Sequence, residues 1–139
     1  MTPETPPVDS RADRTSQGVV AVVLLAAFVF GQIWVVPVLA VLVGVGAAFG
    51  PAANPFLRLF SAFIAPRIPS PSTFEDPETV RVQDVLAVAL LGAATLAVLI
   101  SLNVVAWIVG LVEAGVAATA ATTGVHVGVA VRDRIRRRA

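Results

Sequence analysis

Two long apolar blocks, separated by a polar and proline-rich insert at 50–81, constrain the fold of this chain more than any other feature. The first block contains no polar side chain from Gly18 to Phe30. Each block is long enough to cross a membrane twice, because one helical crossing needs about 20 apolar residues. A helix on the surface of a soluble protein would carry a polar face, which these blocks lack. The sequence therefore predicts an integral membrane protein.

Composition agrees with this prediction and excludes several classes of site. Of the 139 residues, 57% are hydrophobic and only 14% are charged, whereas a soluble domain has about 25% charged residues. The absence of cysteine excludes a disulfide framework, a thiol nucleophile and a thiolate metal site. With a single histidine, a haem or transition-metal site is not expected either, and we predict no cofactor.

The two blocks divide into four expected transmembrane helices, at about 16–33, 36–50, 83–101 and 104–124. Each pair is joined by a tight turn without charge. Trp34 lies in the first turn and Trp107 lies near the second, as is typical of tryptophan at a membrane–water interface. We therefore predict an all-α membrane protein whose four helices form two tandem helical hairpins.

The insert between the hairpins is expected to carry an amphipathic helix in the plane of the membrane surface. Segment 54–75 opens with Asn54 and Pro55, and aromatic residues then recur at helical spacing. Such a helix lies at the interface with its apolar face toward the lipid. The expected interfacial residues are Phe56, Arg58, Phe60 and Phe63, together with Trp34 and Trp107 in the turns. An extended linker follows at 66–71.

The order of these signals repeats after 67 residues. Asp9 and Asp76 are candidate helix N-caps, and Arg14 and Arg81 follow each of them by five residues. A span, a tight turn and a second span come next in both halves. Because each repeat has an even number of spans, we predict parallel repeats. Arg81 also lies three residues before Asp84, so these two side chains either form an ion pair or are solvated independently.

Orientation is predicted from the arginines, which are the only basic residues. They are Arg11, Arg14, Arg58, Arg67, Arg81, Arg132, Arg134, Arg136, Arg137 and Arg138. None of them lies in a tight turn, so both termini and the insert are expected in the cytoplasm. We expect a disordered tail at 1–8, a transmembrane domain at 9–131 and a basic cytoplasmic tail at 132–139. Beside a membrane, this tail is expected to set the topology and to meet anionic lipid rather than nucleic acid.

Glu113 is the candidate polar site inside the membrane, and it is the only acidic residue expected inside an apolar span, because the apolar run of the third span begins at about Val85. It lies ten residues after Asn103, about 15 Å along a helix and near the middle of the bilayer. Small residues share its helix face: Ala106, Gly110, Ala117, Ala121, Gly124 and Gly128. This stripe predicts that Glu113 points into the bundle. It is either a proton or cation site or a structural acid, with Thr95 as the expected hydrogen-bond partner. His126 lies about 20 Å further along the axis and is expected to be solvated.

The motifs together also carry a family resemblance. They are Asp9-x-Arg11-x-x-Arg14, Asn54-Pro55-Phe56 through Phe60, Pro66-Arg67, and Glu75-Asp76-Pro77 with Arg81. In this order they resemble the domain-of-unknown-function 4395 family of small bacterial integral membrane proteins, over nearly the whole chain beyond residue 8. The resemblance implies a four-span bundle in the bacterial plasma membrane, with no established activity. Similar proteins often carry a close cysteine pair near the end of the fourth span, but the corresponding segment 123–128 has none.

Three functions remain open from the sequence. The first is a non-catalytic membrane module or complex subunit whose insert and tail dock a cytoplasmic partner. The second is a small proton-linked transporter that uses Glu113 and works as a homo-oligomer. The third is a membrane redox or sulfur-metabolism subunit, which the absence of cysteine disfavours. Because no nucleophile–base pair or metal-ligand spacing occurs, the protein is not expected to be an enzyme.

Overall fold

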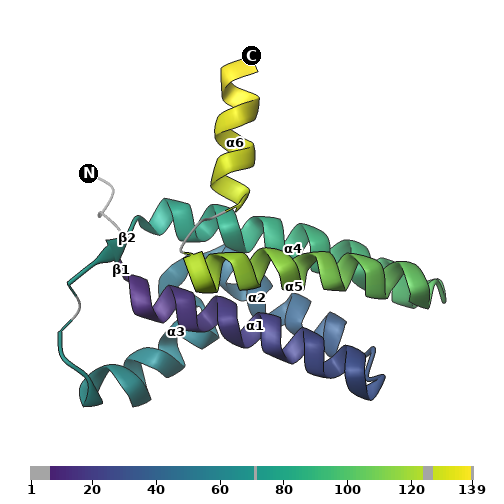
Figure 1. Ribbon diagram of the computed structural model, residues 1–139, viewed down its shortest axis with the longest axis horizontal. Helices are drawn as coiled ribbons and strands as arrows, with labels where there is room; N and C mark the ends of the chain where they lie inside the picture. Colours follow the sequence, from purple (N-terminus) through teal and green to yellow (C-terminus); the bar gives the residue numbers. More distant parts are fainter. Residues whose placement is uncertain (1–6, 71, 124–126, 139) are drawn as a thin grey trace.

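The computed structural model is an elongated bundle of helices with a basic helix standing off one side (Figure 1). It describes residues 7–70, 72–123 and 127–138. The long helices are α1 (Ser10–Phe30), α2 (Val35–Phe49), α4 (Pro77–Leu99) and α5 (Asn103–Thr123), and α6 (Val127–Arg138) is the basic helix. The expectation of an all-α protein is therefore confirmed.

Both α1 and α4 begin where the sequence predicted. The carboxylates of Asp9 and Asp76 accept hydrogen bonds from the backbone N–H groups of Arg11 and Glu78, each at 2.9 Å. Such caps satisfy N–H groups that have no partner within the helix. Partial burial tends to raise the pKa of Asp9, but its hydrogen bonds with Arg11 outweigh this effect and hold the pKa below its usual value. The helix starts are thus determined by local chemistry.

The helices pack across the two halves of the chain. Helix α1 packs mainly on α5, α2 packs on α4, and α4 packs on α5, whereas α1 and α2 touch only slightly. The main core consists of Val20, Ala21, Leu24, Val36, Leu39, Val43, Ala87, Leu91, Ala94, Ala114 and Ala117. Small residues on α5 let the neighbouring backbones approach closely. The two turns occur as expected, but the first hairpin is opened and its helices are paired with those of the second.

Three described helices are long and apolar enough to cross a membrane: α1, α4 and α5. Helix α2 is apolar but has only 15 residues. It ends at Gly50, whose positive φ of 95° suits glycine, and a 3₁₀ turn at Pro51–Ala53 follows. The expected second span, at about 36–50, is therefore shorter than a full crossing.

The 67-residue repeat is visible in the way the halves are joined. The guanidinium of Arg14 donates to the carbonyl oxygens of Ala121 and Thr122, at 2.9 and 2.6 Å. The guanidinium of Arg81 donates in the same way to the last carbonyls of α2, those of Ala47 and Ala48, at 3.1 and 3.2 Å. Each arginine therefore caps the C-terminal end of the antiparallel neighbour, where carbonyl groups lack partners within the helix.

The insert differs from the expected interfacial helix. Helix α3 (Pro55–Leu59), a π-helical segment (Phe60–Ile64) and a 3₁₀ turn (Ala65–Arg67) follow one another. Phe60 is only 5% exposed and packs in a second apolar cluster with Val8, Ala12, Leu57 and Val80. Phe56 packs against the main core, and only Phe63, at 62% exposed, is open to the surroundings. The expectation that the aromatics share one lipid-facing side is therefore wrong, because the bundle itself offers them an apolar surface.

The ends of the chain also depart from expectation. Val8 is buried and belongs to strand β1 (Val8–Asp9), which pairs antiparallel with strand β2 (Phe74–Glu75). The boundary of the expected disordered tail is thus wrong at residue 8, while residues 1–6 lie outside the described part of the chain. The basic tail is not a separate segment from 132 on, because its described residues belong to α6.

Candidate functional site

Polar side chains are buried along the inner faces of the helices, inside an otherwise apolar bundle. They are Asp13, Ser16 and Gln17 on α1, Asn54 before α3, Gln83 and Asp84 on α4, and Glu113 on α5. Burial of a polar group without hydrogen bonds costs free energy, and burial of an unpaired charge costs far more. These residues are therefore the candidates for a functional site inside the bundle.

One part of this cluster is a hydrogen-bonded pair that joins three elements. The Asn54 side-chain N–H donates to Asp84 Oδ2 at 3.2 Å, and Asn54 Oδ1 accepts from the backbone N–H groups of Phe56 and Leu57. A Cβ atom at Gly46 would lie 2.9 Å from both Asn54 Nδ2 and Asp84 Oδ2. The pair therefore requires glycine at position 46, because any larger residue would clash with it. At this point α2, the start of α3 and α4 meet.

Glu113 is the second part of the cluster. Its side chain is completely buried, and neither carboxyl oxygen has a hydrogen-bond partner among the residues that the structure describes. The neighbouring carboxyl group that acts on it electrostatically is Asp84. Glu113 points into the bundle as predicted, and three residues of the expected stripe, Ala106, Gly110 and Ala117, are buried on the same helix. Gly124 of that stripe lies outside the described residues.

The expected hydrogen bond between Glu113 and Thr95 is not formed, so this prediction is wrong. The Thr95 hydroxyl donates to the Leu91 backbone oxygen at 2.7 Å, within its own helix. A threonine in a helix can satisfy its hydroxyl in this way without any tertiary partner. Glu113 is consequently left without the neutral partner that a purely structural acid needs.

Asp84 was expected only as a possible partner of Arg81 near the membrane surface, not as a buried site residue, and two expectations need correction. Arg81 does not pair with Asp84, because the arginine turns to the end of α2 while the aspartate faces inward. Glu113 is also not the only acid buried among the membrane helices. A signal was present: Asp84, Ala87, Leu91 and Ala94 follow one another at spacings of three and four, which places them on one helix face.

The other predicted residues occupy separate places. Trp34 is exposed beside the first turn, and Trp107 makes an edge-to-face contact with Phe28 with ring centroids 5.4 Å apart. Arg58 and Arg67 are on the surface of the insert. His126 lies outside the described residues. Over residues 7–70, 72–123 and 127–138, no group of three or more His, Cys, Asp or Glu side chains is placed to hold a metal ion.

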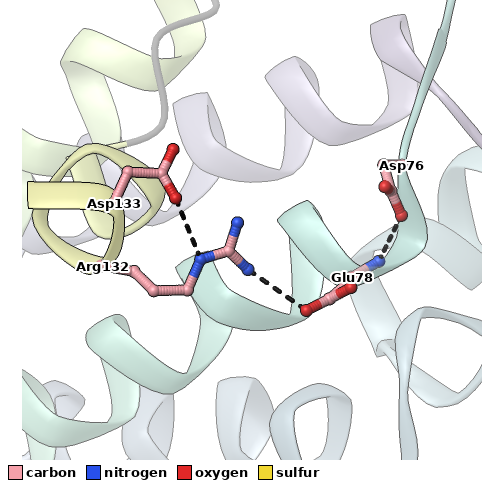
Figure 2. A network of polar contacts seen from close by, with 4 residues as sticks. All are labelled: Asp76, Glu78, Arg132 and Asp133. Carbon is pink, nitrogen blue, oxygen red and sulfur yellow. Dashed lines mark hydrogen bonds and ion pairs between the residues drawn. The ribbon is translucent and has the colours of Figure 1, made fainter. Parts of the chain in front are cut away.

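Helix α6 is a second candidate feature, and it stands off one side of the bundle (Figure 1). It packs on α4 and runs across the long direction of the bundle. Figure 2 shows the contact: Arg132 reaches Glu78 at 3.2 Å and Asp133 at 3.4 Å, while Asp76 caps the start of α4 beside them. The remaining arginines of this helix are exposed: Arg134, Arg136, Arg137 and Arg138.

Comparison with known protein families identifies the family of this chain. A family model described as a domain of unknown function, DUF4395, matches residues 8–137. This match covers nearly the whole chain and confirms the resemblance in the sequence motifs. No curated protein and no solved structure matches the chain.

Proposed function

The chain belongs to the DUF4395 family, and from this premise we propose that it is a non-catalytic membrane module that docks an acidic cytoplasmic partner through α6. The observation that carries this proposal is the exposure of four arginines on a helix that stands off the bundle (Figure 1). Like charges gathered on one surface favour a partner of opposite charge and steer its approach.

The attachment of α6 to the bundle supports this role. Its ion pair with the bundle joins Arg132 to Glu78, whose side chain is 70% exposed. Exposed ion pairs of this kind contribute about 0–1 kcal/mol. This ion pair therefore contributes little to the attachment of α6, and a partner that takes over Arg132 replaces it at little cost.

We place the protein in the bacterial cytoplasmic membrane, with both termini and the insert in the cytoplasm. In this arrangement α1, α4 and α5 cross fully, and α2 makes a fourth, shallow crossing. Fifteen residues of helix extend over about 22 Å, less than the hydrocarbon thickness of about 30 Å. The cytoplasmic boundary therefore dips toward the end of α2, near Gly46 and Asn54. Helix α6, which runs across the bundle, lies along this surface.

The orientation is tested by cysteine labelling, which the cysteine-free chain makes direct. Single substitutions Gln32→Cys and Asn103→Cys are expected to react with a membrane-impermeant thiol reagent on intact cells, because they lie at the two turns. Ser70→Cys and Ala139→Cys are expected to react only after lysis. Reaction of Ser70→Cys on intact cells would reverse the orientation.

The docking role is tested by replacing Arg134, Arg136, Arg137 and Arg138 together with glutamine. After purification in mild detergent, the protein partner is expected to be reduced at least tenfold, because the complementary charge is removed. The control carries Arg58→Gln and Arg67→Gln, which remove surface arginines from the insert and should retain the partner. Labelling of Ser70→Cys in the same background verifies that the orientation is unchanged. If the α6 variant keeps its protein partner and loses only anionic lipid, the docking proposal is wrong.

A proton-linked transporter that uses Glu113 is the second candidate. The specific observation in its favour is the complete burial of a carboxyl group that lacks a hydrogen-bond partner in the described residues. Ionisable groups inside a membrane bundle commonly mark proton or ion pathways. This candidate and the docking module are separated by substitution of Glu113, which should abolish transport and leave docking through α6 unchanged.

A further inference from the structure

We propose that Glu113 is a proton-binding site inside the bundle, and that Asp84 relays its proton to and from the cytoplasmic side. The ligand is a proton, and the site consists of two carboxyl groups on neighbouring helices. The inference goes beyond docking through α6, because it requires no partner. A proton-linked transporter would need such a site, but the site can be present without transport.

The proton is assigned to Glu113 because of what surrounds each acid. The Glu113 carboxyl is completely buried and accepts no hydrogen bond from any described residue. A negative charge there would have no compensation, whereas a neutral acid costs much less to bury. Asp84 differs, because its Oδ2 accepts the Asn54 amide N–H. When one proton is shared between the two acids, the charge therefore resides on Asp84.

The charged groups on the packed elements agree with this assignment. Helix α4 contributes Asp84, and α1 contributes the buried Asp13 and also Arg14, whose guanidinium is bound to carbonyl oxygens at the end of α5. Helix α2 contains no titratable residue. No cation among the described residues donates to the Glu113 carboxyl. Two acids in one water-poor interior favour a state in which only one is ionised.

A route for the proton lies on the cytoplasmic side of Asp84. A hollow of about 450 Å³ is lined by Phe49, Gly50, Pro51, Ala52, Asp76, Pro77, Glu78 and Arg81. Arg81 is three residues before Asp84 on α4, and Gly50 is four residues after Gly46 at the end of α2, so the hollow begins about one helical turn from the Asn54–Asp84 pair. It is roomy and polar enough for water. A proton leaving Glu113 passes to the Asp84 carboxylate and then to this water, with no change in oxidation state.

The experiment is infrared spectroscopy of the full-length protein in lipid nanodiscs at neutral pH. Wild type is expected to show the carbonyl band of a neutral carboxylic acid, and Glu113→Gln is expected to lack it. Should Glu113→Gln fail to fold, Glu113→Asp gives the same assignment by shifting the band. The control Asp133→Asn changes an exposed acid on α6 and should keep the band. A wild-type spectrum without the band, or a band that survives Glu113→Gln, overturns the site.

The relay is tested on the same band by transfer into heavy water. Exchange of the carboxyl proton for deuterium shifts the band, and Asp84→Asn is expected to slow this exchange at least tenfold because asparagine cannot carry the proton. Asparagine still offers an oxygen to Asn54, so the pair is preserved. If the proton exchanges at the wild-type rate in Asp84→Asn, Asp84 does not relay it and this part of the proposal is wrong. Co-purification of a partner through α6 is expected to be unchanged in Glu113→Gln, so the two proposals fail independently.

Discussion

Gly46→Ala is expected to lower the free energy of unfolding by about 2–4 kcal/mol, although it adds a single methyl group. The new Cβ would lie 2.9 Å from Asn54 Nδ2 and from Asp84 Oδ2, closer than real Cβ contacts allow. Either α2 moves away from α4 or the hydrogen bond between the two side chains breaks. A broken bond leaves a buried amide and a buried carboxylate without their mutual partner. The loss is measured by denaturant unfolding in mild detergent.

Gly44→Ala is the matched control, two residues away on the same helix. A Cβ there would meet only Val88 Cγ2 at 4.0 Å, an ordinary contact. Alanine is the better helix former by about 1 kcal/mol, so this variant should be as stable as wild type or more stable. If Gly46→Ala proves equally stable, the Asn54–Asp84 pair does not lie against α2 as described.

Glu113→Met is expected to raise the free energy of unfolding by about 1–3 kcal/mol. Methionine has a similar shape, and it replaces a buried carboxyl group that no described residue hydrogen-bonds. The desolvation cost of the acid is therefore removed without leaving a cavity. Thermal or denaturant unfolding in mild detergent measures the gain. A gain in stability from this substitution would fit the trade-off between stability and activity that is common at functional sites.

The same variant separates the two candidate functions. A proton-linked transporter should lose transport with Glu113→Met, whereas a docking module should keep its partner bound through α6. Glu113→Gln serves as the control, since it keeps a polar group and should change the stability by less than about 1 kcal/mol. Destabilisation by Glu113→Met would show that the carboxyl group has a stabilising partner in the membrane.

The sequence by itself determined the class of fold and the starts of α1 and α4. Apolar length predicts membrane crossing without knowledge of any neighbour. Asp9 and Asp76 mark helix starts because a cap needs only the backbone of the next turn. The 67-residue repeat was likewise readable, since its signals are local in both halves. Even the direction of Glu113 followed from the small residues on its own helix face.

Only the tertiary structure decided which helices pair and where polar groups point. Local spacing places Arg81 beside Asp84. Because α2 packs against α4, however, Arg81 donates hydrogen bonds to backbone carbonyls of α2, and Asp84 accepts one from Asn54. The sequence pattern predicts that Phe60 faces lipid from an interfacial helix, yet residues of the bundle and of β1 cover it. These outcomes depend on contacts between residues far apart in the chain. Which partner a side chain contacts depends on the surface that packing places beside it. A local sequence pattern carries no information about that surface.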